Sequence, residues 1–336
     1  MPIVSIVTPS YNQAGYLEQA IRSVLEQDYP QIEYLIIDGA SNDGSVDIIQ
    51  RYAHYLAHWV SERDSGQAEA INKGMARARG EIVAWLNSDD FYLPGTVAAA
   101  VRAFEDHPEA LLVYGDMLAV DASGQPINLL RYRPLALTDL LCFQIIGQPA
   151  VFLRRTAWER AGGLDPSYHF LLDHHLWIRV AAQGPIVHIP QLWAAARYHA
   201  AAKNRAQAVA FGHEAFRILE WAKAQPDLAP ALAPILKRAT ASAHRVNARY
   251  LLDGGDPWAG LRAWLRTFAI HPPTALARFN LLGSALLAIL GLGRLREWVI
   301  HRRSLRYRRR PQTVASPTDA AEHRYHIHCS NSDIAE

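Results

Sequence analysis

Two adjacent carboxylates stand where an apolar run of the sequence stops. In EIVAWLNSDDFYLPG (residues 81–95), Asp89 and Asp90 follow a run with the composition of a buried strand. Paired acids in a loop are typical ligands of a hard divalent cation, Mg²⁺ or Mn²⁺, which takes oxygen ligands and keeps positions open for phosphate. The alternative is that both acids cap a helix starting near Gly95 or lie in solvent, and the pair alone does not separate these interpretations.

The chain around this pair is predicted to alternate between strands and helices. β-branched or fully apolar runs predict strands at residues 3–8, 32–38, 57–62 and 81–86. Segments with helical spacing lie between them, and the third, GQAEAINKGMARARG, is expected to end at Gly80. Such alternation indicates an α/β fold with a mostly parallel sheet covered by helices.

Polar, acidic and glycine residues follow each of these strands. The four strand ends read TPSYN (8–12), DG (38–39), ERDSG (62–66) and NSDD (87–90). Open α/β sheets bind ligands at the carboxyl ends of their strands, so these residues are expected to form one site. No G-x-G-x-x-G motif follows the first strand and no G-x-x-x-x-G-K-[ST] motif occurs, which argues against a dinucleotide enzyme and a P-loop.

Composition narrows the class of protein. The 336 residues carry a formal net charge of +2, which gives no case for nucleic acid as a partner. The sequence has two cysteines, Cys142 and Cys329, which lie far apart. They argue against a framework of disulfide bonds and favour a reducing compartment. The first residues, MPIVSIVTPSYN, enter a strand pattern with no basic leader, so we expect a cytoplasmic protein rather than a secreted one.

Four blocks in order resemble the family-two glycosyltransferases with the GT-A fold. The blocks are VSIVTPSYNQAGYLEQAIRSVLEQDYP, IEYLIIDGASNDGS, SERDSGQAEAINKG and GEIVAWLNSDDFYLPG, and the resemblance covers roughly residues 3–200. It implies a Rossmann-like, mostly parallel mixed sheet, with a donor half at 1–120 and an acceptor half at 121–200. It also implies an inverting hexosyltransferase that uses a nucleotide-sugar donor, with a UDP-sugar favoured, and Mn²⁺ or Mg²⁺.

The resemblance assigns donor-side roles by position. Thr8 and Pro9 would line the base and ribose pocket, and Asp38 would accept a hydrogen bond from uracil. Asp89 and Asp90 would hold the metal and diphosphate, with Asp90 the stronger candidate for direct ligation. The remaining donor-binding candidates are Tyr11, Gly66, Gln67, Asn72, Lys73 and Asn87.

Two positions depart from the family's usual pattern. Asn87 stands where the acidic motif often begins with Asp, which lowers the local charge. Ile71 stands where many relatives have an arginine that contacts the diphosphate. Either Lys73 or the metal alone would then neutralise the diphosphate, and the sequence leaves both alternatives open.

The acceptor side resembles the family in the segment IGQPAVFLRRTAWERAGGLDPSYHFLLDHHLWIRVAAQG. Asp173 falls where the family carries its catalytic base, at a helix start that favours an ionised carboxylate, although a helix cap is the simpler alternative. Trp177 is expected in the core. The other candidates are Gln148, Asp165 and His175 for the acceptor pocket, and His199 for the metal. The acceptor would be a glycan or a lipid-linked glycan.

Beyond residue 200 the sequence predicts only helices, in an extension over 201–310. Residues 275–293 are strongly apolar, and residues 294–310 carry eight arginines against one glutamate. This pairing favours an interfacial anchor on an anionic membrane, at the inner face of the cell membrane; the alternative is a buried helix with a solvated basic tail. Residues 311–336 are expected to be disordered, although HRYHIHC within them has metal-ligand spacing.

Two competing functions remain open from the sequence. A sugar nucleotidyltransferase would need a glycine-rich and basic loop after the first strand, and TPSYNQAG has no such loop. A catalytically decayed nucleotide-sugar-binding or scaffold protein is the second alternative, suggested by Asn87 and Ile71.

Overall fold

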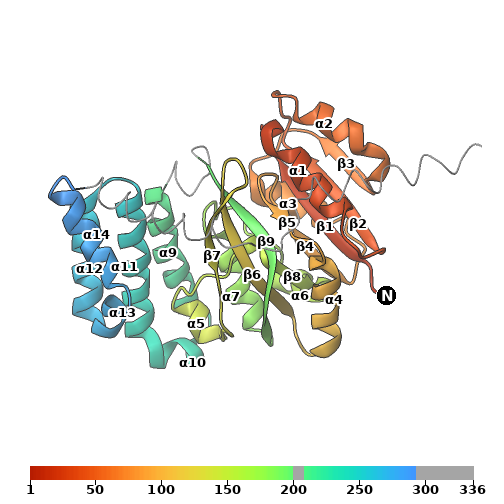
Figure 1. Ribbon diagram of the computed structural model, residues 1–336. Helices are drawn as coiled ribbons and strands as arrows, with labels where there is room; N and C mark the ends of the chain where they lie inside the picture. The colour runs from red at the N-terminus through yellow and green to blue at the C-terminus, as the bar shows by residue number, and fades with distance from the viewer. Residues whose placement is uncertain (200–207, 293–336) are drawn as a thin grey trace, which may run out of the picture.

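A mixed sheet forms the centre of the protein in the computed structural model, which describes residues 1–199 and 208–292 (Figure 1). Its nine strands are β1 (Val4–Ser10), β2 (Ile32–Asp38), β3 (His58–Ser61), β4 (Ile82–Trp85), β5 (Phe91–Tyr92), β6 (Leu112–Asp121), β7 (Pro126–Leu130), β8 (Val151–Arg154) and β9 (Ile186–Tyr198). The strand order is β3-β2-β1-β4-β8-β6-β9-β5, with β7 paired to β6.

The four strands predicted from the sequence form the parallel part of this sheet. β1 lies between β2 and β4, β2 also pairs with β3, and all three pairings are parallel. Their carboxyl ends therefore meet at one edge, as expected. β8 runs antiparallel between β4 and β6, and β6 pairs in parallel with the long β9. The expected α/β fold with a mostly parallel mixed sheet is confirmed.

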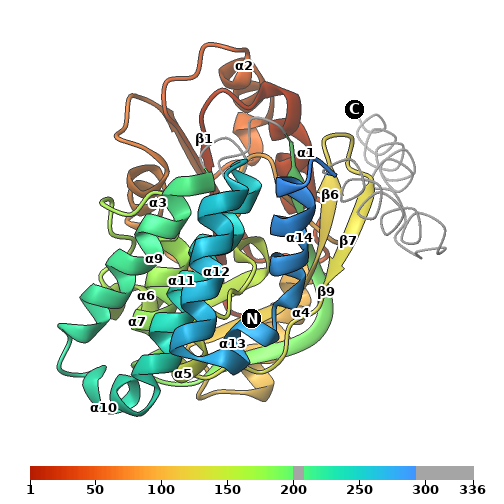
Figure 2. The ribbon, with the colours of Figure 1, turned by 90° about the vertical axis from the view of Figure 1, so that its left-hand side faces the viewer.

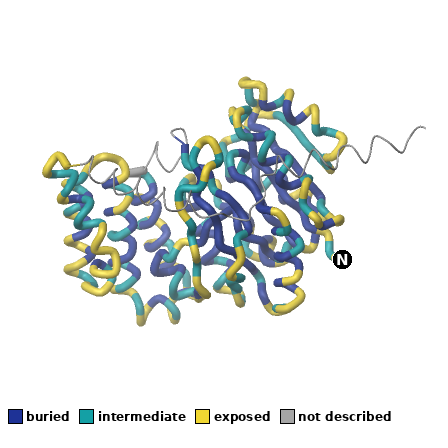
Figure 3. The backbone as a smooth tube through the Cα atoms, viewed as in Figure 1, coloured by how far each residue is buried: buried dark blue, intermediate teal, exposed yellow. Residues whose placement is uncertain are grey.

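Helices cover both faces of the sheet. Buried side chains of α1 (Ala14–Leu25), α2 (Ser45–Tyr52) and α4 (Thr96–Asp106) pack on one face. Those of α3 (Gln67–Met75), α6 (Arg155–Ala161) and α7 (Leu172–Ala181) pack on the other. Short turns complete this part of the chain: η1 (Ala53–Tyr55), α5 (Leu137–Leu141) and η2 (Gln148–Ala150). Figure 3 shows that the backbone is buried along the strands and exposed mainly at loops and outer helices.

The expectation that the third helix ends at Gly80 is wrong, because α3 ends at Met75. Gly80 lies against β1 instead, and its N–H donates to Ser5 Oγ at 2.8 Å. A Cβ atom at this position would come within 2.6 Å of the Ile3 carbonyl oxygen, so the close approach of two backbones requires glycine.

The second half of the chain ends in a helical extension, as the sequence predicts (Figure 2). Its elements are α9 (Ala208–Lys223), α10 (Ala229–Leu232), η3 (Ala233–Ile235), α11 (Leu236–Asp253), α12 (Pro257–Ile270), α13 (Pro272–Leu276) and α14 (Phe279–Ile289). α11 packs between α9 and α12. Side chains of α9 and α11, among them Phe211, Ile218 and Val246, belong to the same buried cluster as α7, so the extension shares the core of the sheet domain.

The apolar segment expected at 275–293 is divided into two helices. α13 ends at Leu276 and α14 begins at Phe279. Across residues 1–199 and 208–292, no helix combines the length and apolar character needed to cross a membrane. The predicted boundary at residue 200, the arginine-rich segment 294–310 and the tail 311–336 with HRYHIHC lie outside the described residues.

Candidate active site

The two acids lie in a tight turn between β4 and β5, called here the acid turn (residues 87–90). Asp90 N–H donates to the Asn87 carbonyl at 3.1 Å, which closes the turn. The Asp90 carboxyl is buried, and both of its oxygens accept hydrogen bonds: Oδ1 from the backbone N–H of Arg197 at 2.9 Å, and Oδ2 from Asn87 Nδ2 at 3.2 Å. Burial and the neighbouring Asp89 raise the pKa of Asp90 well above its usual value.

Asp89 has the more open carboxylate of the pair. Its side chain is 22% exposed, and its Oδ2 lies 3.1 Å from His199 Nε2. The His199 ring is buried and packs against Tyr16, with ring centroids 4.8 Å apart. Neither acid caps α4, which begins at Thr96 behind Gly95. Asp89 is therefore the acid of this turn that a ligand could reach, and His199 lies beside it.

The chemistry of this pair fits a divalent cation with an open coordination sphere. Across the described residues, no group of three or more His, Cys, Asp and Glu side chains gathers into a closed metal site. Carboxylate oxygen and imidazole nitrogen both suit Mn²⁺, and a cation bound by few protein ligands leaves positions for phosphate oxygens. The residues present thus fit the implied metal.

Arg197, which the sequence did not single out, holds the acid turn in place. Besides its backbone N–H on Asp90, its Nε donates to the Asp89 carbonyl at 2.9 Å, and its Nη1 donates to the Asp121 and Ala122 carbonyls. Its Nη2 also donates to Gln19 on α1. The guanidinium is buried and lies 4.8 Å from the centroid of the Tyr16 ring. No local motif could have identified it, because all of these partners are distant in sequence.

Asn87 connects the acid turn to both halves of the sheet domain. Its Oδ1 accepts from Gln67 Nε2 at 2.7 Å, and its Nδ2 donates to Asp90 Oδ2 and, at 3.1 Å, to Gln148 Oε1. Gln148 in turn donates from Nε2 to the Trp85 carbonyl at 2.8 Å. The side chain of an aspartate at position 87 would have no N–H group to donate to Asp90 Oδ2 and Gln148 Oε1. Asparagine, which departs from the usual aspartate of the family, therefore fits the hydrogen-bond partners around position 87.

The ends of β1 and β2 form a second polar region beside the acid turn. Asp38 is buried; its Oδ1 accepts from Ser41 Oγ, and its Oδ2 accepts from Ser41 N–H and, at 2.7 Å, from Ser61 Oγ. Tyr11 is 63% exposed at the end of β1. A Cβ atom at Gly39 would come within 2.9 Å of Asp64 Oδ2 and 3.3 Å of the Tyr11 ring, so these three residues are adjacent. Asp64 is a further polar residue that the sequence did not assign.

Several predicted donor-side residues have their side chains engaged elsewhere. Thr8 Oγ1 is buried and lies 2.9 Å from the Tyr34 hydroxyl, and Pro9 is buried in β1. The Asn72 amide bonds to both backbone groups of Leu164, at 2.8 and 3.0 Å. Lys73 forms ion pairs with Glu62 and Glu69, at 3.1 and 2.9 Å. Gly66 precedes α3 with a φ of 131°, a conformation that favours glycine.

Asp173 lies in the first turn of α7, and its Oδ1 accepts the His174 N–H at 2.7 Å. Burial raises the pKa of Asp173 to about 6. Trp177, one turn later on the same face of α7, is fully buried and stacks on Trp85 with ring centroids 5.2 Å apart. Because Trp85 is the last residue of β4, Asp173 is positioned near the edge that carries the acid turn.

Three tyrosines, Tyr132, Tyr198 and Tyr250, lie near Asp173 or Asp90. Burial raises the pKa of Tyr132 and of Tyr250, in the latter to about 12, and both rings also feel the charges of Tyr198 and Asp173. Burial likewise raises the pKa of Tyr198, and the charge of Asp90 adds to this effect. Asp90 and Asp173 therefore lie near the same group of tyrosines.

The side chains of the other acceptor-side candidates, His175 and Asp165, contact neighbouring parts of the protein. His175 is buried between the rings of Tyr168 and Trp221, at 4.2 and 4.3 Å, and its ring nitrogens have no hydrogen-bond partner among the described residues. Burial lowers the pKa of His175 to about 3, so the ring is neutral. Asp165 accepts the Ser167 N–H at 2.9 Å and shapes the loop before α7.

Comparisons with known proteins find glycosyltransferases with similar sequences. The sequence profile of Glycosyl transferase family 2 matches residues 5–146. The putative teichuronic acid biosynthesis glycosyltransferase TuaG of Bacillus subtilis is 34% identical over 190 residues, which cover 54% of this chain and 73% of TuaG. Chondroitin synthase of Escherichia coli is 26% identical over 196 residues, which cover 57% of this chain but only 28% of the synthase.

Solved structures show a similar fold. The mannosyltransferase PcManGT of Pyrobaculum calidifontis, in complex with GDP-Man and Mn²⁺, has a TM-score of 0.58 at 23% identity and covers 87% of each chain. Residues 1–349 of S. aureus TarS, in complex with UDP-GlcNAc, have a TM-score of 0.58 at 16% identity, covering 85% of this chain and 90% of the other. At these identities the likeness concerns the fold.

Replacement of Arg197 should disturb the acid turn. We expect Arg197→Met to lower the free energy of unfolding by about 3 kcal/mol, because it leaves several buried carbonyls without donors. We also expect it to weaken nucleotide binding in the presence of Mn²⁺. Chemical denaturation and titration calorimetry measure both effects, and Arg102→Met, at an exposed position of α4, is the matched control. Equal behaviour of the two variants would contradict this role of Arg197.

Proposed function

This chain belongs to glycosyl transferase family 2, and we propose that its active site transfers a sugar from a nucleoside-diphosphate donor to an acceptor hydroxyl, with a divalent cation and with inversion at the anomeric carbon. The observation that carries the proposal is the stack of Trp177, one turn beyond Asp173 on α7, on Trp85 at the end of the strand that leads into the acid turn, together with the raised pKa of Asp173. The names of two relatives, which refer to teichuronic acid biosynthesis and chondroitin synthesis, support a surface glycan or lipid-linked glycan as the acceptor.

The donor base would bind at the ends of β1 and β2. The exposed ring of Tyr11 offers a stacking surface for a base, and Asp38 would accept the uracil N–H by exchanging one of its serine bonds. A UDP-sugar is favoured, and the UDP-GlcNAc bound to TarS supports this choice, whereas the GDP-Man bound to PcManGT supports the guanosine alternative.

Asp89, rather than Asp90, is the direct metal ligand in this proposal, which reverses the order suggested by the sequence. Both oxygens of Asp90 already accept hydrogen bonds, while Asp89 is more open and adjoins His199. When bound there, a divalent cation would neutralise the charge that develops on the departing diphosphate. Because Lys73 is paired with Glu62 and Glu69, we assign this charge neutralisation to the cation rather than to Lys73.

Transfer would then follow one displacement. Asp173 accepts the proton of the acceptor hydroxyl as the new bond from its oxygen to the anomeric carbon forms. The bond from that carbon to the diphosphate oxygen breaks on the opposite face, and its electron pair leaves with the nucleoside diphosphate. A carboxylate with a pKa of about 6 is mostly ionised at pH 7 and is more basic than an ordinary aspartate.

Titration calorimetry with UDP and GDP, with and without Mn²⁺, tests the donor site. We expect one nucleotide to bind more tightly with Mn²⁺, and Asp89→Asn to lose that gain by a factor of ten or more, about 1.4 kcal/mol. Asp90→Asn should retain most of it, because asparagine keeps an acceptor for the Arg197 N–H. No binding of either nucleotide would favour the decayed scaffold protein, and loss in Asp90→Asn alone would overturn the assignment of Asp89.

A pH profile tests the base. The rate of sugar transfer or donor hydrolysis should fall with unit slope as the pH drops through about 6, because protonated Asp173 cannot accept a proton. Asp173→Asn should bind the nucleotide normally and lose activity by a factor of 100 or more. Release of nucleoside diphosphate from a panel of nucleotide sugars provides the assay. Full activity of Asp173→Asn excludes Asp173 as the base.

We further propose that the end of the helical extension contacts an anionic membrane at the inner face of the cell membrane. Large apolar side chains are exposed on α12 and α14 and just after α14, among them Trp258 at 60%, Phe279 at 58% and Leu290 at 70%. Exposed arginines on and next to these helices, Arg262, Arg266 and Arg278, suit anionic lipid headgroups. The arginine-rich sequence that follows, outside the described residues, has the same charge.

Vesicle sedimentation of the full chain tests this contact. The protein should sediment with vesicles rich in phosphatidylglycerol at low salt, and not with pure phosphatidylcholine, because both charge and apolar surface contribute. The double variant Trp258→Ser/Phe279→Ser should bind several-fold more weakly, while Tyr55→Ser, at a 52% exposed tyrosine of η1, should not. Protein that remains in the supernatant under all conditions refutes the membrane contact.

A further inference from the structure

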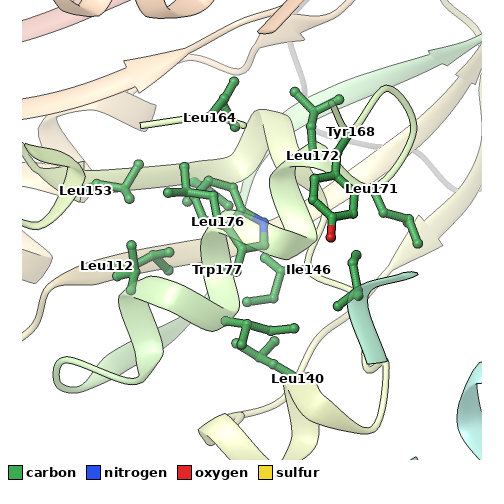
Figure 4. Close-up of a cluster of buried hydrophobic side chains, with 14 of the residues drawn as sticks. Leu112, Leu140, Ile146, Leu153, Leu164, Tyr168, Leu171, Leu172, Leu176 and Trp177 are labelled. Atoms are coloured by element: carbon green, nitrogen blue, oxygen red, sulfur yellow. The ribbon is translucent and has the colours of Figure 1, made fainter. Parts of the chain in front are cut away.

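Helix α9 of the extension lies along the loop that leads into α7. The rings of Phe211 and Phe170 are 5.0 Å apart, and one side of Trp221 covers His175 at 4.3 Å. Between them, Arg217 Nη1 donates to the Ser167 carbonyl at 3.0 Å. Several turns of α9 therefore contact this loop and the first turn of α7. Figure 4 shows Tyr168, Leu171 and Leu172 at one edge of the buried cluster that contains Trp177.

Glu214 makes the most specific of these contacts. Its side chain is buried, and its carboxylate accepts three consecutive backbone N–H groups: His169 on Oε1 at 2.6 Å, and Phe170 and Leu171 on Oε2 at 2.8 and 2.7 Å. Among the described residues it forms no ion pair with a lysine, arginine or histidine. A buried carboxylate without a cation beside it needs hydrogen-bond donors around it, and these three N–H groups supply them. Hydrogen bonds to a charged carboxylate are also stronger than bonds to a neutral amide, so Glu214→Gln should weaken all three.

The three N–H groups lie directly before α7. Leu171 is the residue before the first turn of the helix, and it offers no side-chain cap. A negative charge at this position is favoured by the helix dipole. Two residues further on is Asp173, whose Oδ1 accepts the N–H of His174 in the same turn. The position of the Asp173 carboxylate thus depends on the backbone of residues 169–171, which Glu214 on α9 holds.

We propose that Glu214 is a positioning residue for sugar transfer, acting from the helical extension through the backbone of residues 169–171 to fix the location of Asp173. This inference rests on the proposed function, in which Asp173 is the base. It makes α9 part of the active site, whereas the sequence showed no chemistry in the extension. Glu214 itself is buried under the loop and does not touch the reacting atoms.

Glu214 also acts on Asp173 through its charge. The groups that face Asp173 are Glu214 on α9, Tyr132 after β7, Tyr250 on α11 and the adjacent His174. After burial, which is the main cause, the negative charge of Glu214 adds to the raised pKa of Asp173. Removal of that charge should therefore lower the pKa of Asp173 and move the acidic limb of the pH profile to lower pH. A residue that only stabilised the fold would not shift this limb.

The experiment compares Glu214→Gln with Arg217→Gln in the full chain. Arg217 contacts the same loop from the next turn of α9: among the described residues it hydrogen-bonds to Ser167 and lies over the Tyr168 ring at 4.5 Å, and it does not bond to residues 169–171. We expect Glu214→Gln to lower kcat ten- to a hundred-fold with an unchanged dissociation constant for the nucleotide, and to shift the acidic limb downward. Glu214→Asp, which keeps the charge, should keep the limb near its wild-type position. Arg217→Gln should change kcat less than three-fold.

Two outcomes distinguish this inference from the proposed function. If Asp173→Asn retains activity, the base is wrong and the proposed function fails. If Asp173→Asn is inactive while Glu214→Gln has wild-type kcat and pH profile, only the positioning role is overturned. Should the Glu214 variants fail to fold, hydrogen exchange of the wild-type protein decides. The amides of residues 169–171 should then exchange as slowly as those of α7, and rapid exchange there excludes the proposed hold.

Discussion

A carboxyl group that is buried beside a second carboxylate needs hydrogen-bond donors from its surroundings, and Asp90 obtains them from two directions. The amide of Asn87 reaches it from within the acid turn, and the backbone of Arg197 reaches it from the end of β9. β9 can supply this donor only because it pairs with both β6 and β5 along its length. The edge of the sheet that carries the site is therefore organised around the burial of this one group.

Three contacts connect residues 1–120 with residues 121–199. Gln148 joins the acid turn to η2, Asn72 joins α3 to Leu164, and Trp85 stacks on Trp177. Each contact links residues that are more than 60 positions apart. Packing and hydrogen bonds thus fix the acid turn relative to η2 and α7.

The sequence predicted the parts of this structure that depend on local pattern. The strands ending in Ser10, Asp38, Ser61 and Trp85 were found because apolar runs and polar stops are visible in a short window. It did not reveal Arg197 or Glu214, whose partners lie far away in sequence and are backbone groups without a side-chain signature. Its ranking of Asp90 above Asp89 as metal ligand remains a prediction, and our opposite proposal uses exposure and hydrogen bonding to β9, which cannot be read from adjacent letters.

The contact between Glu214 and the loop before α7 constrains how these two segments can change during evolution. Because three backbone donors of the described structure hold the carboxylate on α9, a change in the backbone path of either segment alone would leave a carboxylate in the interior without donors. The loop at 167–171 and the first two turns of α9 are thus expected to diverge as a pair, and a chimera that joins the sheet domain of one relative to the helices of another would need both segments from the same parent.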